Sequence, residues 1–200
     1  MLNLPNKRQG PVISVIPSRV PTPDEVVIVP PQILKVATTV SNRLTPNVHA
    51  MWAFGGDIGE QLLGVNVNSD HLEILTTTSG CEEICEELSE CVTLKPATAE
   101  KKLDREADVE GTMLPVHIKS HYAELTVDGV KIEVYGDKQI KVGEWEWGDP
   151  IFFNADYTYV SGGKLPLVPL SLNSELDIGL GWMDRVSKIS DAVIQKHHNH

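Results

Sequence analysis

The chain has 200 residues, of which 41% are hydrophobic and 22% are charged, and its formal net charge is −11 at pH 7. This length and composition are typical of one globular domain with a real core, or of one domain with an extended arm. The negative charge repels nucleic acid, and no strong Lys/Arg cluster offsets it. We therefore expect no nucleic-acid partner.

The lengths of the apolar runs and the number of cysteines indicate the cellular compartment. No apolar run is long enough to cross a membrane, and the N-terminus lacks the apolar core of a signal peptide. Three cysteines, Cys81, Cys85 and Cys91, lie in one segment, an odd number that favours a reducing compartment. We expect a cytoplasmic protein with no membrane partner.

Residues 1–31 hold seven prolines separated by short β-branched runs. Proline removes a backbone donor and fixes φ, which excludes helix and central strand here. We expect an extended arm that packs on the domain or joins subunits into a homo-oligomer, with partial disorder as the alternative. Residues 32–196 would form the domain, and residues 197–200, HHNH, a tail that frays or binds metal.

Two helices are predicted before the middle of the chain. Residues 31–44 carry apolar side chains at three- and four-residue spacing, and Pro46 should end that helix. Residues 79–90 begin with a capping-box pattern and place the cysteines on one face and five glutamates on the other. No paired CxxC supports zinc, so core packing is the simpler interpretation of the cysteines.

The sequence of the second half of the domain predicts several strands followed by a C-terminal helical segment. Residues 95–112 suggest a loop or short helix, whereas 116–127 and 130–135 flank Asp128-Gly129, a strong hairpin signal. Residues 141–147 alternate again, with Trp145 and Trp147 interpreted as core or interface, and residues 157–163 suggest a turn. A helical segment from residue 174 should break near its glycines.

Residues 51–76 say most about function. A short apolar run leads to Gly55-Gly56, then to a short amphipathic helix, a polar loop and an alternating strand over 71–75. Glycines let backbone approach a ligand closely, and free helix amides attract phosphate. Alternation places His71 and Glu73 on one face of the strand, so metal-binding groups would lie beside a phosphate cradle.

The glycine pair followed by His71-Leu72-Glu73-Ile74 resembles the signature of the nucleotidyltransferase fold, the DNA polymerase β superfamily. The resemblance covers roughly residues 32–190, although only the short signature is specific. It implies an α/β (α+β) fold with a mixed, mainly antiparallel sheet and helices packed on one side. It also implies a nucleoside triphosphate substrate, a divalent metal (Mg or Mn) if the protein is active, and a third carboxylate on a neighbouring strand, for which Glu133 fits.

Under this resemblance Gly55 and Gly56 would bind the nucleotide, Glu73 and Glu133 would be catalytic, and both would hold metal together with His71. Two residues depart from the family pattern. His71 stands where a carboxylate is expected, and imidazole suits Zn²⁺ or Mn²⁺ better than Mg²⁺. Asp57 follows the glycine pair, where it would compete with phosphate for the helix amides.

Three functional hypotheses remain open. The first is an enzyme that transfers a nucleoside monophosphate from a triphosphate to a small molecule or protein, using two metal ions. The second is a degenerate member that binds nucleotide or regulates a protein partner, as antitoxin-like relatives of this fold do. The third is a structural oligomer built through the arm and the Trp145/Trp147 face.

Overall fold

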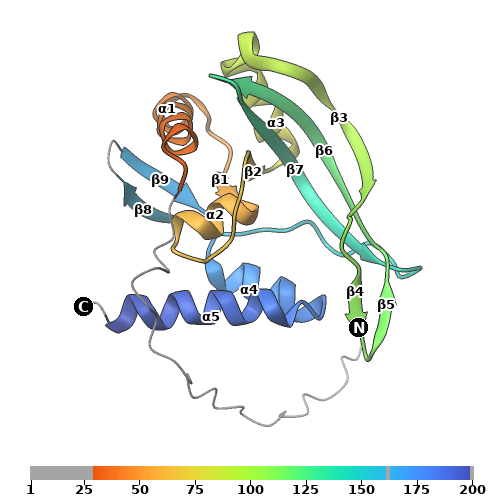
Figure 1. The fold of residues 1–200 in the computed structure, drawn as a ribbon. Helices are drawn as coiled ribbons and strands as arrows, with labels where there is room; N and C mark the ends of the chain where they lie inside the picture. Colours follow the sequence, from red (N-terminus) through yellow and green to blue (C-terminus); the bar gives the residue numbers. More distant parts are fainter. Residues whose placement is uncertain (1–28, 161–162, 199–200) are drawn as a thin grey trace.

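The structure is a computed structural model that describes residues 29–160 and 163–198. A seven-stranded mixed sheet in the order β3-β6-β7-β2-β1-β9-β8 forms its centre (Figure 1). The β2–β7 and β1–β9 pairs are parallel, and the other neighbours are antiparallel. The strands are β1 (Trp52–Gly55), β2 (Leu72–Thr76), β3 (Val92–Lys102), β6 (Val116–Val127), β7 (Val130–Val142), β8 (Asp156–Val160) and β9 (Gly163–Leu167).

Two helices cover one face of this sheet. They are α1 (Pro31–Asn47) and α3 (Thr78–Glu87), and a 3-10 turn (Ser89–Cys91) follows α3. Both helices pack on the inward side chains of β1, β2, β6, β7 and β9 and enclose the main apolar core. Cys81 and Cys85 are buried in that core, so the packing interpretation of these cysteines is confirmed. The glutamates of this segment are not merely solvated, because Glu87 of α3 and Glu90 of the 3-10 turn pair with Arg43 of α1.

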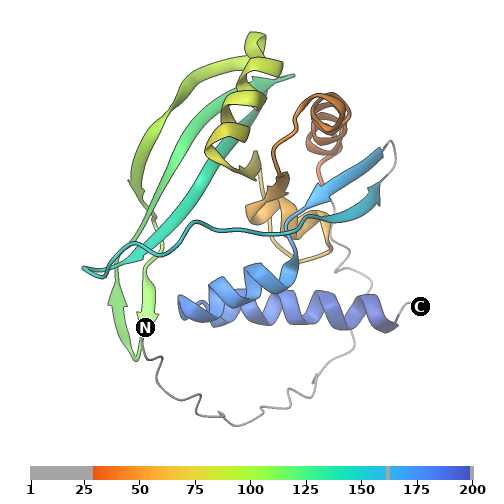
Figure 2. The same cartoon turned by 180° about the vertical axis from the view of Figure 1, so that it is seen from behind.

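The remaining helices lie toward one end of the sheet (Figures 1 and 2). α2 (Gly56–Leu62) leaves β1 directly, and α4 (Leu170–Gly179) and α5 (Met183–His198) form an antiparallel pair across that end. Gly181, with φ +70°, makes the break between α4 and α5 that the sequence predicted. The small hairpin of β4 (Ala107–Val109) and β5 (Thr112–Leu114) packs against this break through the Asp108 N–H, which donates to the Leu180 carbonyl.

Several sequence predictions hold and others are wrong. Asp128-Gly129 makes the expected hairpin turn, with φ +48° and +79°. Residues 95–102 belong to β3 instead of a loop, because β3 is an edge strand exposed on both faces and therefore lacks an alternating pattern. Pro46 lies inside the last turn of α1, so it does not end the helix as predicted.

Two other corrections concern the region after the hairpin. β7 runs on to Val142, where Gly143, with φ +55°, turns the chain, so residues 143–147 form no strand. Trp145 is 57% exposed and is not a core residue. Residues 157–160 form most of β8 where a turn was predicted, because Tyr-Thr-Tyr-Val is rich in strand-forming side chains.

The predicted arm falls outside the described residues up to residue 28, as do residues 199–200 of the predicted tail. Within the part that the structure describes, no helix combines the length and the apolar character needed to span a membrane.

Candidate functional site

One row of residues crosses four adjacent strands. Gly55 on β1 pairs with Glu73 on β2, which pairs with Glu133 on β7, which pairs in turn with Glu124 on β6. Residues directly opposite each other on neighbouring strands project to the same side of a sheet. The glutamates share the face opposite α1 and α3, because the residues that alternate with them lie in the main core. The structure thus brings Glu73 and Glu133 together.

The glycine pair is closely packed against this row. Gly56 has φ +58°, and a Cβ there would lie 2.6 Å from Glu73 Oε2. A Cβ on Gly55 would lie 3.0 Å from Leu75 Cγ and 3.2 Å from Val168 Cγ2. Both glycines therefore have a packing explanation, and their role in binding phosphate stays a prediction. α2 is also only seven residues long, which limits its dipole.

A lysine neutralises the carboxylate beside Gly56. Lys138 Nζ lies 2.8 Å from Glu73 Oε1, and the two side chains are only 18% and 16% exposed. The same ammonium group lies 4.5 Å from the centroid of the Tyr135 ring, a cation–π distance. Glu73 is therefore paired with an internal cation.

Glu133 is held even more tightly. Its carboxylate accepts hydrogen bonds from Lys131 Nζ at 2.7 Å, Tyr122 Oη at 3.1 Å and Tyr135 Oη at 2.5 Å, and Lys101 Nζ lies 3.7 Å away. Burial alone would raise its pKa, but the hydrogen bonds from Lys131 and Tyr135 outweigh burial and hold the pKa at about 2. Glu133 is thus an ionised, fully partnered carboxylate.

Charges balance across this network. Lys131 Nζ also lies 3.1 Å from Glu124 Oε1, so three ammonium groups face three carboxylates. Burial, followed by the charge of Glu73, raises the pKa of the Tyr135 phenol, which keeps it a neutral donor. We call the set the lysine–glutamate network; it comprises Glu73, Lys101, Tyr122, Glu124, Lys131, Glu133, Tyr135 and Lys138.

His71 makes no hydrogen bond or ion pair with the network. It precedes β2, and its Nδ1 lies 2.9 Å from Oδ1 of the adjacent Asp70, whose side chain is 99% exposed. The imidazole is therefore oriented by a surface carboxylate next to it in sequence. The structure does not bring His71 together with Glu73 and Glu133 as a set of three ligands.

These residues do not fit a divalent metal ion in the arrangement observed. Mg²⁺ needs several free oxygen ligands, whereas the Glu73 and Glu133 carboxylates are engaged by ammonium and phenol donors. Among the residues that the structure describes, no three His, Cys, Asp or Glu side chains are grouped closely enough to hold a metal. The metal-ligand roles of His71, Glu73 and Glu133 stay predictions.

Asp57, which was expected to compete with phosphate for the helix amides, is paired with an arginine. Its Oδ1 accepts from Arg185 Nη1 of α5 at 2.6 Å, and Arg185 also donates to Glu60 Oε1 at 2.8 Å and Asp177 Oδ2 at 3.2 Å. One guanidinium thus ties α2, α4 and α5 together. Burial raises the pKa of Glu60, which is 2% exposed, to about 6.

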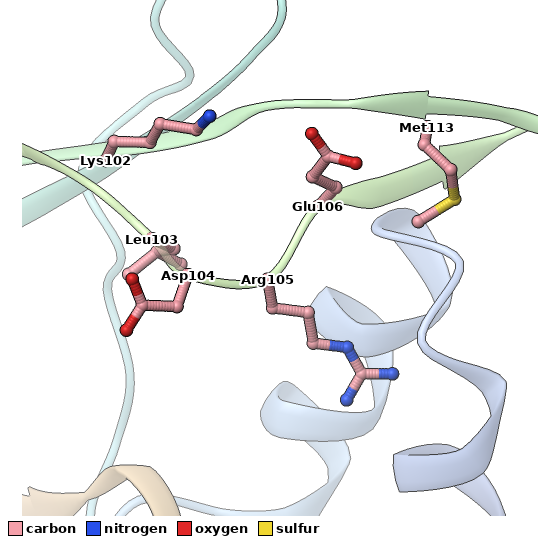
Figure 3. Close-up of a pocket in the computed structure, with 6 residues that line it drawn as sticks. All are labelled: Lys102, Leu103, Asp104, Arg105, Glu106 and Met113. Carbon is pink, nitrogen blue, oxygen red and sulfur yellow. The ribbon is translucent and has the colours of Figure 1, made fainter.

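A separate pocket of about 490 Å³ lies where the chain passes from β3 to β4 (Figure 3). Its lining includes none of the lysine–glutamate network; the residues are Lys102, Leu103, Asp104, Arg105, Glu106 and Met113. Arg105 pairs with Asp184 and stacks 4.7 Å from the centroid of the Trp182 ring, so this arginine holds the β3–β4 connection to the α4–α5 break.

Sequence reasoning missed Lys101, Lys138 and Arg185 but not Lys131. Lys131, Glu133 and Tyr135 alternate on one face of their strand, so Glu133 could be expected to pair with Lys131, as it does. Lys138 lies 65 residues from Glu73, and Arg185 lies 128 and 125 residues from Asp57 and Glu60, so no local pattern predicts these pairs.

No family model and no curated protein sequence matches this chain. Solved structures do. The crystal structure of a candidate nucleotidyltransferase from Thermotoga maritima matches with a TM-score of 0.63 at 25% identity, over 84% of this chain and 96% of that one. A lincosamide antibiotic adenylyltransferase, solved with lincomycin bound, gives 0.44 at 9% identity, over 82% and 98%. The chain has the nucleotidyltransferase fold, as the glycine pair and the strand from His71 predicted.

Proposed function

We propose that this protein binds a nucleoside triphosphate on the glutamate face of the sheet, with lysines in place of divalent metal ions, and does not transfer the nucleotide. The nucleotidyltransferase fold supports a nucleoside triphosphate as the ligand. The observation that carries the rest is Lys138 Nζ, 2.8 Å from the carboxylate that packs on Gly56. An ammonium group there supplies the positive charge that a metal ion would otherwise supply.

The exposed members of the network support phosphate binding. Lys101 and Lys131 have side chains 48% and 46% exposed, and their ammonium groups lie on the face that carries Glu73. Each ammonium has three donors, so a phosphate can be bound by donors that the carboxylates leave over. A charged hydrogen bond to phosphate contributes about 1.5–3 kcal/mol.

Calorimetric titration with ATP and GTP in EDTA, Mg²⁺ and Mn²⁺ tests this proposal. We expect binding in EDTA, and a roughly tenfold or greater loss of affinity in Lys131→Met. Lys119→Met is the matched control, because Lys119 lies over Trp147 and outside the network. Transfer of label from an α-labelled triphosphate should not occur. Binding that needs Mg²⁺, together with label transfer, would overturn the proposal.

The second candidate is metal-dependent transfer of a nucleoside monophosphate to a small molecule or protein. The match along 96% of a candidate nucleotidyltransferase favours it. It requires Lys138 and Lys131 to leave Glu73 and Glu133 when metal and nucleotide bind. Label transfer that Glu73→Gln abolishes would establish this candidate. A protein partner and a homo-oligomer through residues 1–31 stay predictions beside both.

A further inference from the structure

The junction of α2, α4 and α5 is unbalanced in charge. Asp57, Glu60 and Asp177 all bind the single guanidinium of Arg185, at 2.6, 2.8 and 3.2 Å. Three carboxylates against one cation would leave two negative charges in a site where the Glu60 and Asp177 side chains are 2% and 7% exposed. Uncompensated charge is costly in such surroundings.

Glu60 is the carboxylate least able to stay ionised. Its Oε1 accepts from Arg185, but its Oε2 is buried and has no hydrogen-bond partner in the structure. Asp57, by contrast, is 44% exposed and retains contact with water. A buried, unpartnered oxygen of this kind is where a proton relieves the excess charge at least structural cost.

We infer that this junction is a proton-sensitive latch: Glu60 takes up a proton on Oε2, and α5 then holds α2 more firmly. The groups that face Glu60 are Asp57 on its own helix, Asp177 on α4 and Arg185 on α5. The charges of Arg105 and Asp184 affect Glu60 only indirectly, because they shift the pKa of Asp177. Protonation weakens the Arg185–Glu60 ion pair itself, but it removes the larger cost of the buried charge, and Arg185 still has Asp57 and Asp177 as partners.

The direction of the pH effect follows from the raised pKa of Glu60. Burial lifts the pKa from 4.5 to about 6, so between these values the folded state binds more protons than the unfolded state. Stability therefore falls as pH rises through 6 and is greatest, for this group, below 4.5. The difference between the two pKa values limits the effect on the unfolding equilibrium constant to about thirtyfold.

The test uses the full chain and denaturant unfolding between pH 5 and 7.5. We expect the ratio of the wild-type to the Glu60→Gln unfolding constant to rise with pH, by about eightfold over this range. Glu175→Gln, at an exposed carboxylate of α4, should give a flat ratio. A Glu60→Gln ratio that is flat within twofold overturns the latch.

Carboxyl NMR of the wild-type chain keeps the latch testable if Glu60→Gln does not fold. One glutamate should titrate with a midpoint near 6, well above the ordinary range of glutamate side chains. A spectrum in which every glutamate titrates below pH 5 would overturn the latch. Neither readout involves nucleotide, so the latch and the proposed function can fail separately.

Discussion

The Lys138–Glu73 pair gives the sharpest stability prediction. Lys138→Met removes the cation and leaves a carboxylate that is only 16% exposed, packed on Gly56. Breaking a buried pair by removing one partner costs about 3–5 kcal/mol, and the residual exposure of both side chains reduces this to about 2–3 kcal/mol. The loss should appear as a lower midpoint of urea unfolding with an unchanged slope.

A double-mutant cycle with Glu73→Gln isolates the pair. With Glu73 neutral, Lys138→Met should cost only about 1 kcal/mol, so the coupling energy should be about 1–2 kcal/mol. Lys119→Met, outside the network, should change stability by less than about 0.5 kcal/mol. A coupling energy below about 0.5 kcal/mol would refute the claim that Lys138 neutralises Glu73.

Three further changes test other parts of the structure. Arg185→Met should cost about 3–5 kcal/mol at pH 7.5, measured by urea unfolding, because it leaves the buried Glu60 without its cation; a loss under about 1 kcal/mol would contradict the junction described. Gly56→Ala should cost about 2 kcal/mol, since φ is +58° and the new Cβ meets the Glu73 carboxylate, and an unchanged thermal midpoint would count against it. As pH falls from 4.5 to 2, the free energy of unfolding of the wild type should decrease by about 3 kcal/mol, because Glu133 stabilises the folded state only while its carboxylate, with a pKa of about 2, is ionised. Glu133→Gln should lack this decrease.

Local patterns predicted the central part of the fold. The alternation over β2 and β7 gave both strands and their faces, because one side of each is buried in the main core. Asp128-Gly129 gave the hairpin, because both residues adopt the positive φ that its turn requires. β3 was not predicted, because neither of its faces is buried and its sequence therefore lacks the alternation of apolar and polar residues that marks a strand.

The candidate site was predictable only in part. The proximity of the glycine pair to Glu73 was predictable because their order and spacing are local, and that of Glu133 to Glu73 followed from the resemblance and its strand face, while the roles of these residues stay predictions. Lys138, the partner of Glu73, could not be predicted, because an ion pair between segments 65 residues apart leaves no local trace. Asp57 illustrates the point: alone it competes with phosphate, but Arg185, 128 residues away, binds it instead.

The cation position beside Glu73 can be probed directly with Mn²⁺, whose paramagnetic resonance signal reports free ion. If Lys138 fills that position, wild type should show no saturable Mn²⁺ site that depends on Glu73, and Glu73→Gln should titrate as wild type does. A stoichiometric Mn²⁺ site in wild type that Glu73→Gln abolishes would contradict the account.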